Sequence, residues 1–176
     1  MFRKSHSNTL RLVILAFLIA LEILLTRFLS INTPIVRIGF GFLPIAVAAI
    51  LYGPIWAGAI YALGDILGMM LFPTGGAYFP GFTLSAFFVG AIYGLILHGH
   101  EVTVKRSLLA STIVAVFIHL LLNTYWLTIL LGQGYLALLP VRIIKCLILI
   151  PIEGIIIPLV YNGILKKIPS INRVTN

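Results

Sequence analysis

Apolar side chains fill this chain in long stretches that no charged residue interrupts. Asp, Glu, Lys and Arg are absent from 38–64, 66–100 and 107–141. A helix that spans the hydrocarbon core of a bilayer needs about 20 predominantly apolar residues, and each stretch is longer than that. The pattern therefore predicts several membrane-spanning helices.

Proline and glycine divide these stretches into separate helices, because proline lacks an N–H group and clashes with the preceding turn. Breaks are expected at Gly53-Pro54 and within 73–81 and 132–140. The first apolar run is long for a signal peptide and no small-x-small cleavage site follows it, so we expect a helix there. The predicted spans are 10–29, 35–52, 55–72, 81–98, 107–131 and 140–165.

Basic residues indicate the orientation of these six spans. With six, the N-terminus, the loop 99–106 and the C-terminus share one side. That side holds Arg3, Lys4, Arg11, Lys105, Arg106, Lys166, Lys167 and Arg173. The opposite connections, 30–34, 73–80 and 132–139, contain no Lys or Arg. This asymmetry predicts cytoplasmic termini, whereas one kinked helix over 44–64 would place Lys105 and Arg106 outside.

Composition excludes several classes of protein. Of 176 residues, 61% are apolar and 9% charged, against about 45–50% and about 25% in soluble domains. Soluble globular, disordered and fibrous proteins are therefore excluded. The net charge is +8, but the basic residues are too sparse for nucleic-acid binding. One cysteine, Cys146, cannot form an internal disulfide. We expect residues 1–176 to form a single all-α membrane domain.

Seven charged residues lie within the predicted spans or at their outer ends. They are Glu22, Arg27, Arg37, Asp65, Arg142, Lys145 and Glu153. A charge in hydrocarbon is costly, so such residues usually face the bundle interior or an aqueous cavity. At about 1.5 Å per residue, all seven lie between the midplane and the outer surface. The sequence therefore predicts a polar cavity that opens to the outside.

The last two predicted helices carry polar and charged residues on shared faces that are expected to line this cavity. Arg142, Lys145 and Glu153 fall within a stripe about 80° wide at about 100° per residue. A second group combines a shared face on 107–131 with aromatic residues of 73–82. Its members are His119, Asn123, Trp126, Tyr78, Phe79 and Phe82. The expected cavity therefore contains both signs of charge and aromatic walls.

Each of these residues also has a structural interpretation. Arginines near a helix end can extend to lipid headgroups, and Lys145 can pair with Glu153 simply to orient helices. Asp65 can be structural as well. Aromatic residues at this depth can belong to an interfacial belt, and histidine or asparagine can bond between helices. The residues alone leave both interpretations open.

The first predicted helix carries Ala16 and Ala20, and small residues four apart let another helix approach closely. Arg27 projects onto the same stripe, so we expect it to point partly toward a partner. No Walker A, H-E-x-x-H or G-x-S-x-G sequence is present. We therefore predict no catalytic residue, no cofactor and no metal site.

These features together resemble the substrate-binding S components of energy-coupling factor transporters. The A-x-x-x-A spacing, the basic cytoplasmic rim and six short helices are typical of that family. The segments 37–46 (RIGFGFLPIA) and 79–86 (FPGFTLSA) are similar to its folate-specific branch. The segments 52–56 (YGPIW) and 64–68 (GDILG) fit the same family. The resemblance covers nearly the whole chain.

The resemblance implies a binding and transport subunit of the bacterial cell membrane rather than an enzyme. S components capture a vitamin outside, then associate with a coupling membrane protein and two cytoplasmic ATPases, and are proposed to topple in the membrane. In this family the A-x-x-x-A surface docks the partner, which implies that role for Ala16 and Ala20. The loop between the first two helices, here 30–35, typically covers the cavity.

For folate, Asp65 or Glu153 is expected to bind the pterin edge, and Arg37, Arg142 and Lys145 the glutamate end. The predicted substrate-binding residues are Arg27, Arg37, Asp65, Tyr78, Phe79, Asn123, Trp126, Arg142, Lys145 and Glu153. Three alternatives stay open: an S component for another vitamin such as pantothenate, a small intramembrane enzyme acting on a lipid, and a structural assembly subunit.

Overall fold

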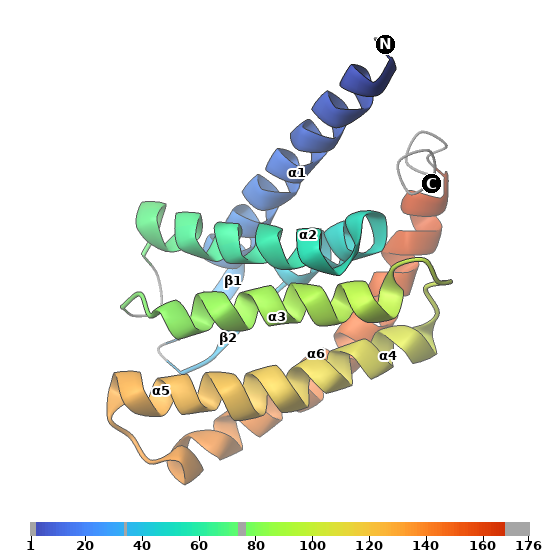
Figure 1. The fold of residues 1–176 in the computed structure, drawn as a ribbon. Coiled ribbons are helices and arrows are strands. Elements are labelled where there is room, and N and C mark those ends of the chain that lie inside the picture. The colour runs from blue at the N-terminus through green and yellow to red at the C-terminus, as the bar shows by residue number, and fades with distance from the viewer. Residues whose placement is uncertain (1–2, 34, 74–76, 168–176) are drawn as a thin grey trace.

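The protein is a bundle of long apolar helices with a short β-hairpin (Figure 1). The computed structural model describes residues 3–33, 35–73 and 77–167. The elements are α1 (Arg3–Arg27), β1 (Ser30–Asn32), β2 (Arg37–Gly39), α2 (Phe42–Leu71), α3 (Pro80–Leu97), α4 (Val104–Ile113), η1 (Val114–Leu122), α5 (Asn123–Leu131), α6 (Tyr135–Gly163) and η2 (Leu165–Lys167).

Five helical stretches in the described part of the chain are long and apolar enough to cross a membrane. They are Thr9–Arg27, Phe42–Leu71, Pro80–Leu97, Val104–Leu131 and Tyr135–Lys167. The predicted all-α membrane class is thereby confirmed. The difference from six spans arises in α2, because its length covers two of the predicted spans.

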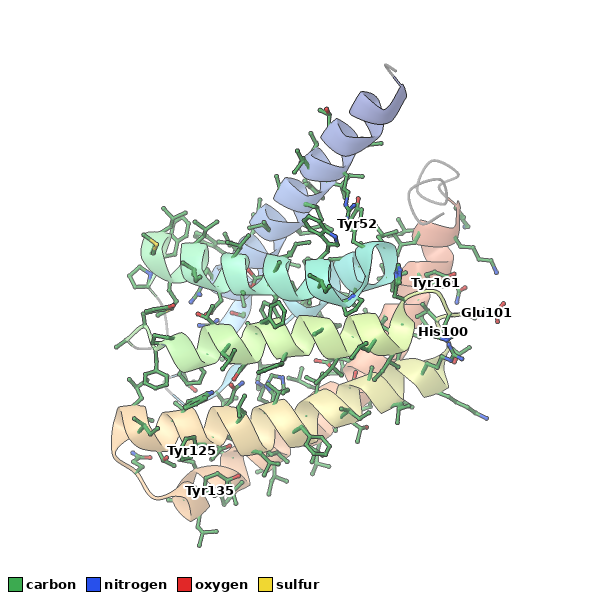
Figure 2. All side chains as sticks on the ribbon, in the orientation of Figure 1. Tyr52, His100, Glu101, Tyr125, Tyr135 and Tyr161 are labelled. Carbon is green, nitrogen blue, oxygen red and sulfur yellow. The ribbon has the colours of Figure 1, made fainter. Side chains whose placement is uncertain are left out.

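The bundle has two distinct ends. His100 and Glu101, in the α3–α4 connection, lie at the same end as Tyr161 of α6, whereas Tyr125 and Tyr135 lie at the other (Figure 2). The second half of α2 lies between α1 and α3, and α4 packs on α6. Toward its N-terminus, α1 diverges from the other helices (Figure 1).

Helix α2 is broken at Gly53, where the predicted break lies. Gly53 has a φ of 81° and a ψ of −174°, a conformation that favours glycine. The break divides α2 into a first part, 42–52, and a second part, 54–71. The first part begins seven residues later than predicted, because 37–39 form a strand that pairs antiparallel with 30–32. The prediction of a helix starting at 35 was therefore wrong.

Contacts with α1 show how the two parts of α2 are arranged. A Cβ atom on Gly41 would lie 3.1 Å from Cγ2 of Thr26, and one on Gly64 would overlap the carboxylate of Glu22. Glu22 and Thr26 are one turn apart on α1. A straight helix would separate residues 41 and 64 by about 35 Å. The chain therefore folds back at Gly53.

His98 stabilises this reversal. In an uninterrupted helix the carbonyl of Ile50 would accept a hydrogen bond from the N–H of residue 54, but Pro54 has none. The Nδ1 atom of His98 lies 2.9 Å from that carbonyl oxygen and donates instead. His98, which resembles a polar loop residue in the sequence, therefore links the end of α3 to the break in α2.

We expect His98→Ala to lower the free energy of unfolding by about 1–3 kcal/mol, because a half-buried carbonyl loses its donor. Thermal unfolding of the detergent-solubilised protein measures this loss. His100→Ala is the matched control, since His100 is exposed and bonds only to the neighbouring carbonyl of His98 among the described residues. Equal melting temperatures for the two variants would contradict the role of His98.

The predicted helix 107–131 is continuous, but its middle is wound differently. Residues 114–122 form the π-helical segment η1 between α4 and α5. A π-helix shifts the backbone hydrogen bonds from i+4 to i+5, and such segments are frequent at functional sites. The last long helix, α6, begins at Tyr135 rather than at Pro140, because Gly132 with its φ of 65° ends α5.

Candidate functional site

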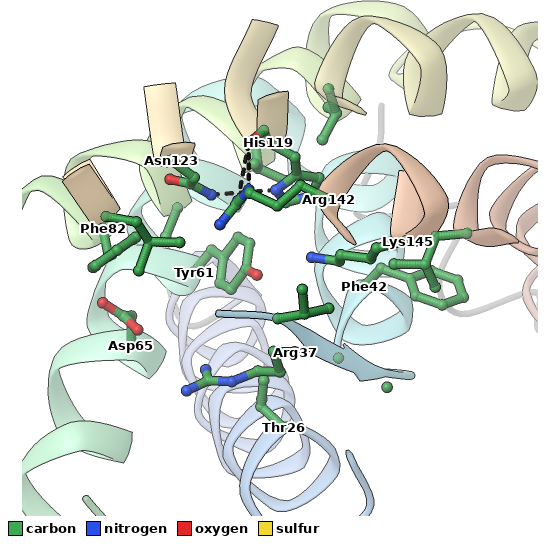
Figure 3. A pocket seen from close by; sticks show the side chains of 18 of the residues that line it. Thr26, Arg37, Phe42, Tyr61, Asp65, Phe82, His119, Asn123, Arg142 and Lys145 are labelled. Carbon is green, nitrogen blue, oxygen red and sulfur yellow. Dashed lines mark hydrogen bonds between the residues drawn. The ribbon is translucent and has the colours of Figure 1, made fainter. Parts of the chain in front are cut away.

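A cavity of about 200 Å³ lies inside the bundle. Its walls come from the end of α1, the hairpin, both parts of α2, residues 77–79, α3, η1, α5 and α6. Arg37, Asp65, Arg142 and Lys145 face this space together with Tyr61 (Figure 3). Charged residues that lie far apart in the sequence are therefore brought together around one site.

Eight of the ten predicted substrate-binding residues line the cavity. They are Arg37, Asp65, Tyr78, Phe79, Asn123, Arg142, Lys145 and Glu153. The other two, Arg27 and Trp126, lie one layer behind it. The Nε1 atom of Trp126 donates to Oγ of Ser85 at 3.1 Å, and its ring centroid is 5.6 Å from that of Phe79. Trp126 therefore supports an aromatic wall of the cavity.

Arg27 is buried and pairs with Asp65 across the α1–α2 contact. Its Nη2 atom lies 3.6 Å from Oδ1 of Asp65, and Nη1 lies 3.1 Å from Sδ of Met69. Ala16 and Ala20 are exposed on the same helix. The prediction that Arg27 points toward a partner with those alanines was therefore wrong. Because α1 diverges from the bundle toward its N-terminus, the helix face that carries Ala16 and Ala20 is exposed, whereas Arg27, nearer the C-terminus of α1, is covered by α2.

Two glycines permit this close contact between charged side chains and a helix. A Cβ atom on Gly68 would lie 2.8 Å from Nε of Arg27, and one on Gly64 would overlap the Glu22 carboxylate. The G-x-x-x-G spacing in the second part of α2 therefore receives two charged residues of α1. Larger side chains at 64 or 68 would displace them.

Asp65 is also bound from α3. Oγ1 of Thr83 donates to Oδ2 of Asp65 at 2.8 Å and lies 3.2 Å from the hydroxyl of Tyr78. Thr83 is three residues after the start of α3, so this cluster lies at the end of the cavity near 77–80. Both carboxylate oxygens of Asp65 therefore have partners within the protein.

Arg142 makes a different kind of contact. Its Nε and Nη2 atoms donate to the carbonyl of His119 at 3.2 and 2.9 Å, and Nη1 donates to the carbonyl of Ile35 at 3.2 Å. His119 lies in η1, where the π-helical winding changes the partners of backbone carbonyls. The buried guanidinium thus ties α6 to η1 and to the hairpin.

Glu153 lies at the opposite end of the cavity from Asp65. Its Oε2 atom accepts a hydrogen bond from the hydroxyl of Tyr93 at 2.5 Å, and Oγ of Ser111 lies 3.4 Å from that hydroxyl. All three residues are buried. Thr83 and Tyr93 are ten residues apart on α3, so the two carboxylates are separated by about 15 Å along that helix.

Lys145 lies on α6 between Arg142 and Glu153 and faces the cavity (Figure 3). Among the described residues, no carboxylate lies within 4.0 Å of the Lys145 ammonium. The alternative of an internal pair between Lys145 and Glu153 is therefore not observed. No hydrogen bond to the Lys145 ammonium is formed within the described part of the chain.

Several lining residues were not predicted. Tyr61 precedes Asp65 by four residues, so a helical projection places both on one face. Tyr93 gave no such signal, because it is 60 residues from Glu153 and lies in an apolar stretch. Its hydrogen-bond partner Ser111 is not a lining residue and is 42 residues from Glu153. Thr33 and Val36 belong to the hairpin, which the sequence did not predict.

Comparison with known proteins shows the family to which the chain belongs. A profile of the family described as ECF transporter, substrate-specific component, matches residues 10–161. The folate transporter FolT of Clostridium novyi is 51% identical over 146 residues, which cover 83% of this chain and 84% of that protein. FolT of Leuconostoc mesenteroides is 33% identical over 152 residues, with 83% and 81% covered.

A solved structure shares the architecture. The crystal structure of FolT bound with folic acid aligns with a TM-score of 0.82 and 37% sequence identity, covering 87% of this chain and 93% of that one. The protein belongs to the substrate-specific components of ECF transporters. The family is therefore a transporter component and not an enzyme, as the sequence resemblance implied.

Proposed function

We propose that the protein is the membrane-embedded, high-affinity folate-binding subunit of an ECF transporter for vitamin uptake. The observation that carries this proposal is the structural match to FolT bound with folic acid, at 37% identity over most of both chains. The two curated relatives described above are also folate transporters.

The chemistry of the cavity supports folate. The pterin ring of folate presents adjacent N–H donors that suit a carboxylate, and its glutamate end carries two carboxylates that suit cations. Asp65 and Glu153 supply acids at the two ends, Arg37 and Lys145 supply cations, and aromatic walls can pack on the rings. A neutral vitamin would need fewer cations.

We further propose six spans with both termini in the cytoplasm. The reversal at Gly53 supports this count, because each part of α2 then follows a separate direction through the bundle. The start of α4, which carries Lys105 and Arg106, lies at the same end as the end of α6 (Figure 1). Basic residues on one side are typical of the cytoplasmic face.

The family supports the remaining expectations about partners and location. We propose association with a coupling membrane protein and two cytoplasmic ATPases, in the bacterial cell membrane, with docking at Ala16 and Ala20. Both alanines are exposed beside Val13 and Phe17, so another helix can reach this part of α1.

Folate binding is tested by titrating the purified protein without ATP or metal. Trp56→Phe leaves Trp126 as the single tryptophan, and Trp126 contacts a cavity wall, so we expect folate to quench its fluorescence saturably. Trp126→Phe is the matched control. Folate recovered by mass spectrometry should be unchanged. Quenching by pantothenate but not by folate would favour another vitamin, and an altered ligand would indicate an enzyme.

A further inference from the structure

The cavity has a carboxylate at each end, and their surroundings differ. We propose that Glu153, held by Tyr93 and Ser111, is the carboxylate that selects the adjacent N–H donors of the pterin ring, and that Asp65 is instead the internal counter-ion of Arg27. This inference rests on the proposed folate function and names the specificity-determining residue within that site.

Asp65 is poorly suited to a ligand because its charge is already compensated. Arg27 approaches one carboxylate oxygen at 3.6 Å, and Thr83 donates to the other at 2.8 Å. A ligand that drew Asp65 away would break its ion pair with the buried guanidinium of Arg27, which is strongly unfavourable. The ion pair also joins α1 to α2, so its first role is to hold those helices together.

The carboxylate of Glu153, unlike that of Asp65, is not compensated by a cation of the protein among the described residues. Its partner in the structure is the neutral hydroxyl of Tyr93, 2.5 Å from Oε2, and in the described residues no cation lies within ion-pairing distance. A carboxylate has about four lone-pair positions, so it can accept from Tyr93 and from two further N–H groups. A buried carboxylate without a counter-ion is costly, and a two-donor ligand removes that cost.

The walls around Glu153 fit a flat ring. Val89, Val114 and Leu149 line the cavity and are buried, as is Tyr93. An apolar slot with one oriented carboxylate matches the pterin ring, which has apolar faces and an edge with a 2-amino group beside N3–H. With the ring at this end, the glutamate end of the ligand extends toward Lys145 and Arg37.

Tyr93 acts through Glu153 and is thus a positioning residue. Its hydroxyl bonds to both Glu153 and Ser111, which fixes the direction of the carboxylate. Losing that hydroxyl should change ligand selectivity more than overall affinity, because the ring keeps its apolar contacts. A purely structural tyrosine would affect all ligands equally.

The test compares 6-methylpterin with 6-methyllumazine, in which an oxygen replaces the 2-amino group. We expect the wild-type protein to prefer the pterin by about ten- to a hundredfold. Glu153→Gln should abolish the preference, and Tyr93→Phe should reduce it. Asp65→Asn should lower the melting temperature and weaken both ligands alike, leaving their ratio intact. Calorimetric titrations and melting curves give these values.

The outcomes separate the two proposals. If wild type binds folate but Glu153→Gln keeps the preference, or Asp65→Asn loses it, the assignment of Glu153 is wrong and the folate function stands. Failure of wild type to bind folate would overturn the function itself. Should Glu153→Gln not fold, Tyr93→Phe retains the carboxylate, and an unchanged preference in that variant would overturn the assignment.

Discussion

Arg142→Ala is expected to lower the free energy of unfolding by about 3 kcal/mol or more, because it removes three charge-assisted hydrogen bonds to two backbone carbonyls. Those carbonyls belong to His119 in η1 and Ile35 in the hairpin. Melting curves in detergent measure the loss. Because the hairpin lines the cavity, we also expect affinity to fall for folate and for a pteridine without the glutamate end.

Two further variants make this prediction specific. Arg142→Lys keeps the charge but lacks the planar guanidinium whose three nitrogens make these bonds, so it should lose most of the same stability. Lys105→Ala removes an exposed cation from α4 and should leave the melting temperature unchanged. If Arg142→Ala kept full stability and weakened folate alone, the arginine would bind the glutamate end directly, as the sequence suggested.

The sequence predicted the elements whose signals are local. The unfavourable free energy of a charge in hydrocarbon is a property of the single residue that carries it. Asp65 and Glu153 could therefore be recognised as cavity residues without knowing any contact. Gly53-Pro54 marked the reversal for the same reason, because the conformations of glycine and proline are properties of those residues. Both predictions are confirmed by the described residues.

The features that were missed depend on distant parts of the chain. The strands 30–32 and 37–39 have three residues each and exist through their pairing, which leaves little pattern in the sequence. The partner of Glu153 is Tyr93, 60 residues earlier, and hydrogen bonds over that distance follow from packing. Helical periodicity therefore found the charged residues but not the hydroxyl groups that orient them.

The predicted shared face of His119, Asn123 and Trp126 is only partly right. His119, Asn123 and Trp126 share a face when each residue turns the helix by about 100°. Residues 114–122 are π-helical, so the turn per residue differs between His119 and Asn123, whereas Asn123 and Trp126 lie together in the α-helical α5. His119 and Asn123 still line the cavity, whereas Trp126 turns toward Ser85 of α3. No pattern in the sequence indicated the π-helix.

Lys145 should have the largest selective effect on folate. Its ammonium faces the cavity and, within the described residues, forms no hydrogen bond or ion pair. A charge-assisted hydrogen bond contributes about 1.5–3 kcal/mol, so we expect Lys145→Met to weaken folate by about ten- to a hundredfold. A pteridine without the glutamate end should change far less, because it has no carboxylate for Lys145 to bind.

Stability separates this role from a structural one. Removing an ammonium that lacks a partner should leave the melting temperature unchanged or raise it, since burial of an unpaired charge is unfavourable. Lys145→Arg keeps the positive charge and should retain part of the folate affinity, whereas Lys145→Met should not. Calorimetric titration of both ligands on each variant, with a melting curve for each, gives the result. An equal loss for the two ligands together with a lower melting temperature would show that Lys145 holds the bundle together and does not bind the glutamate end.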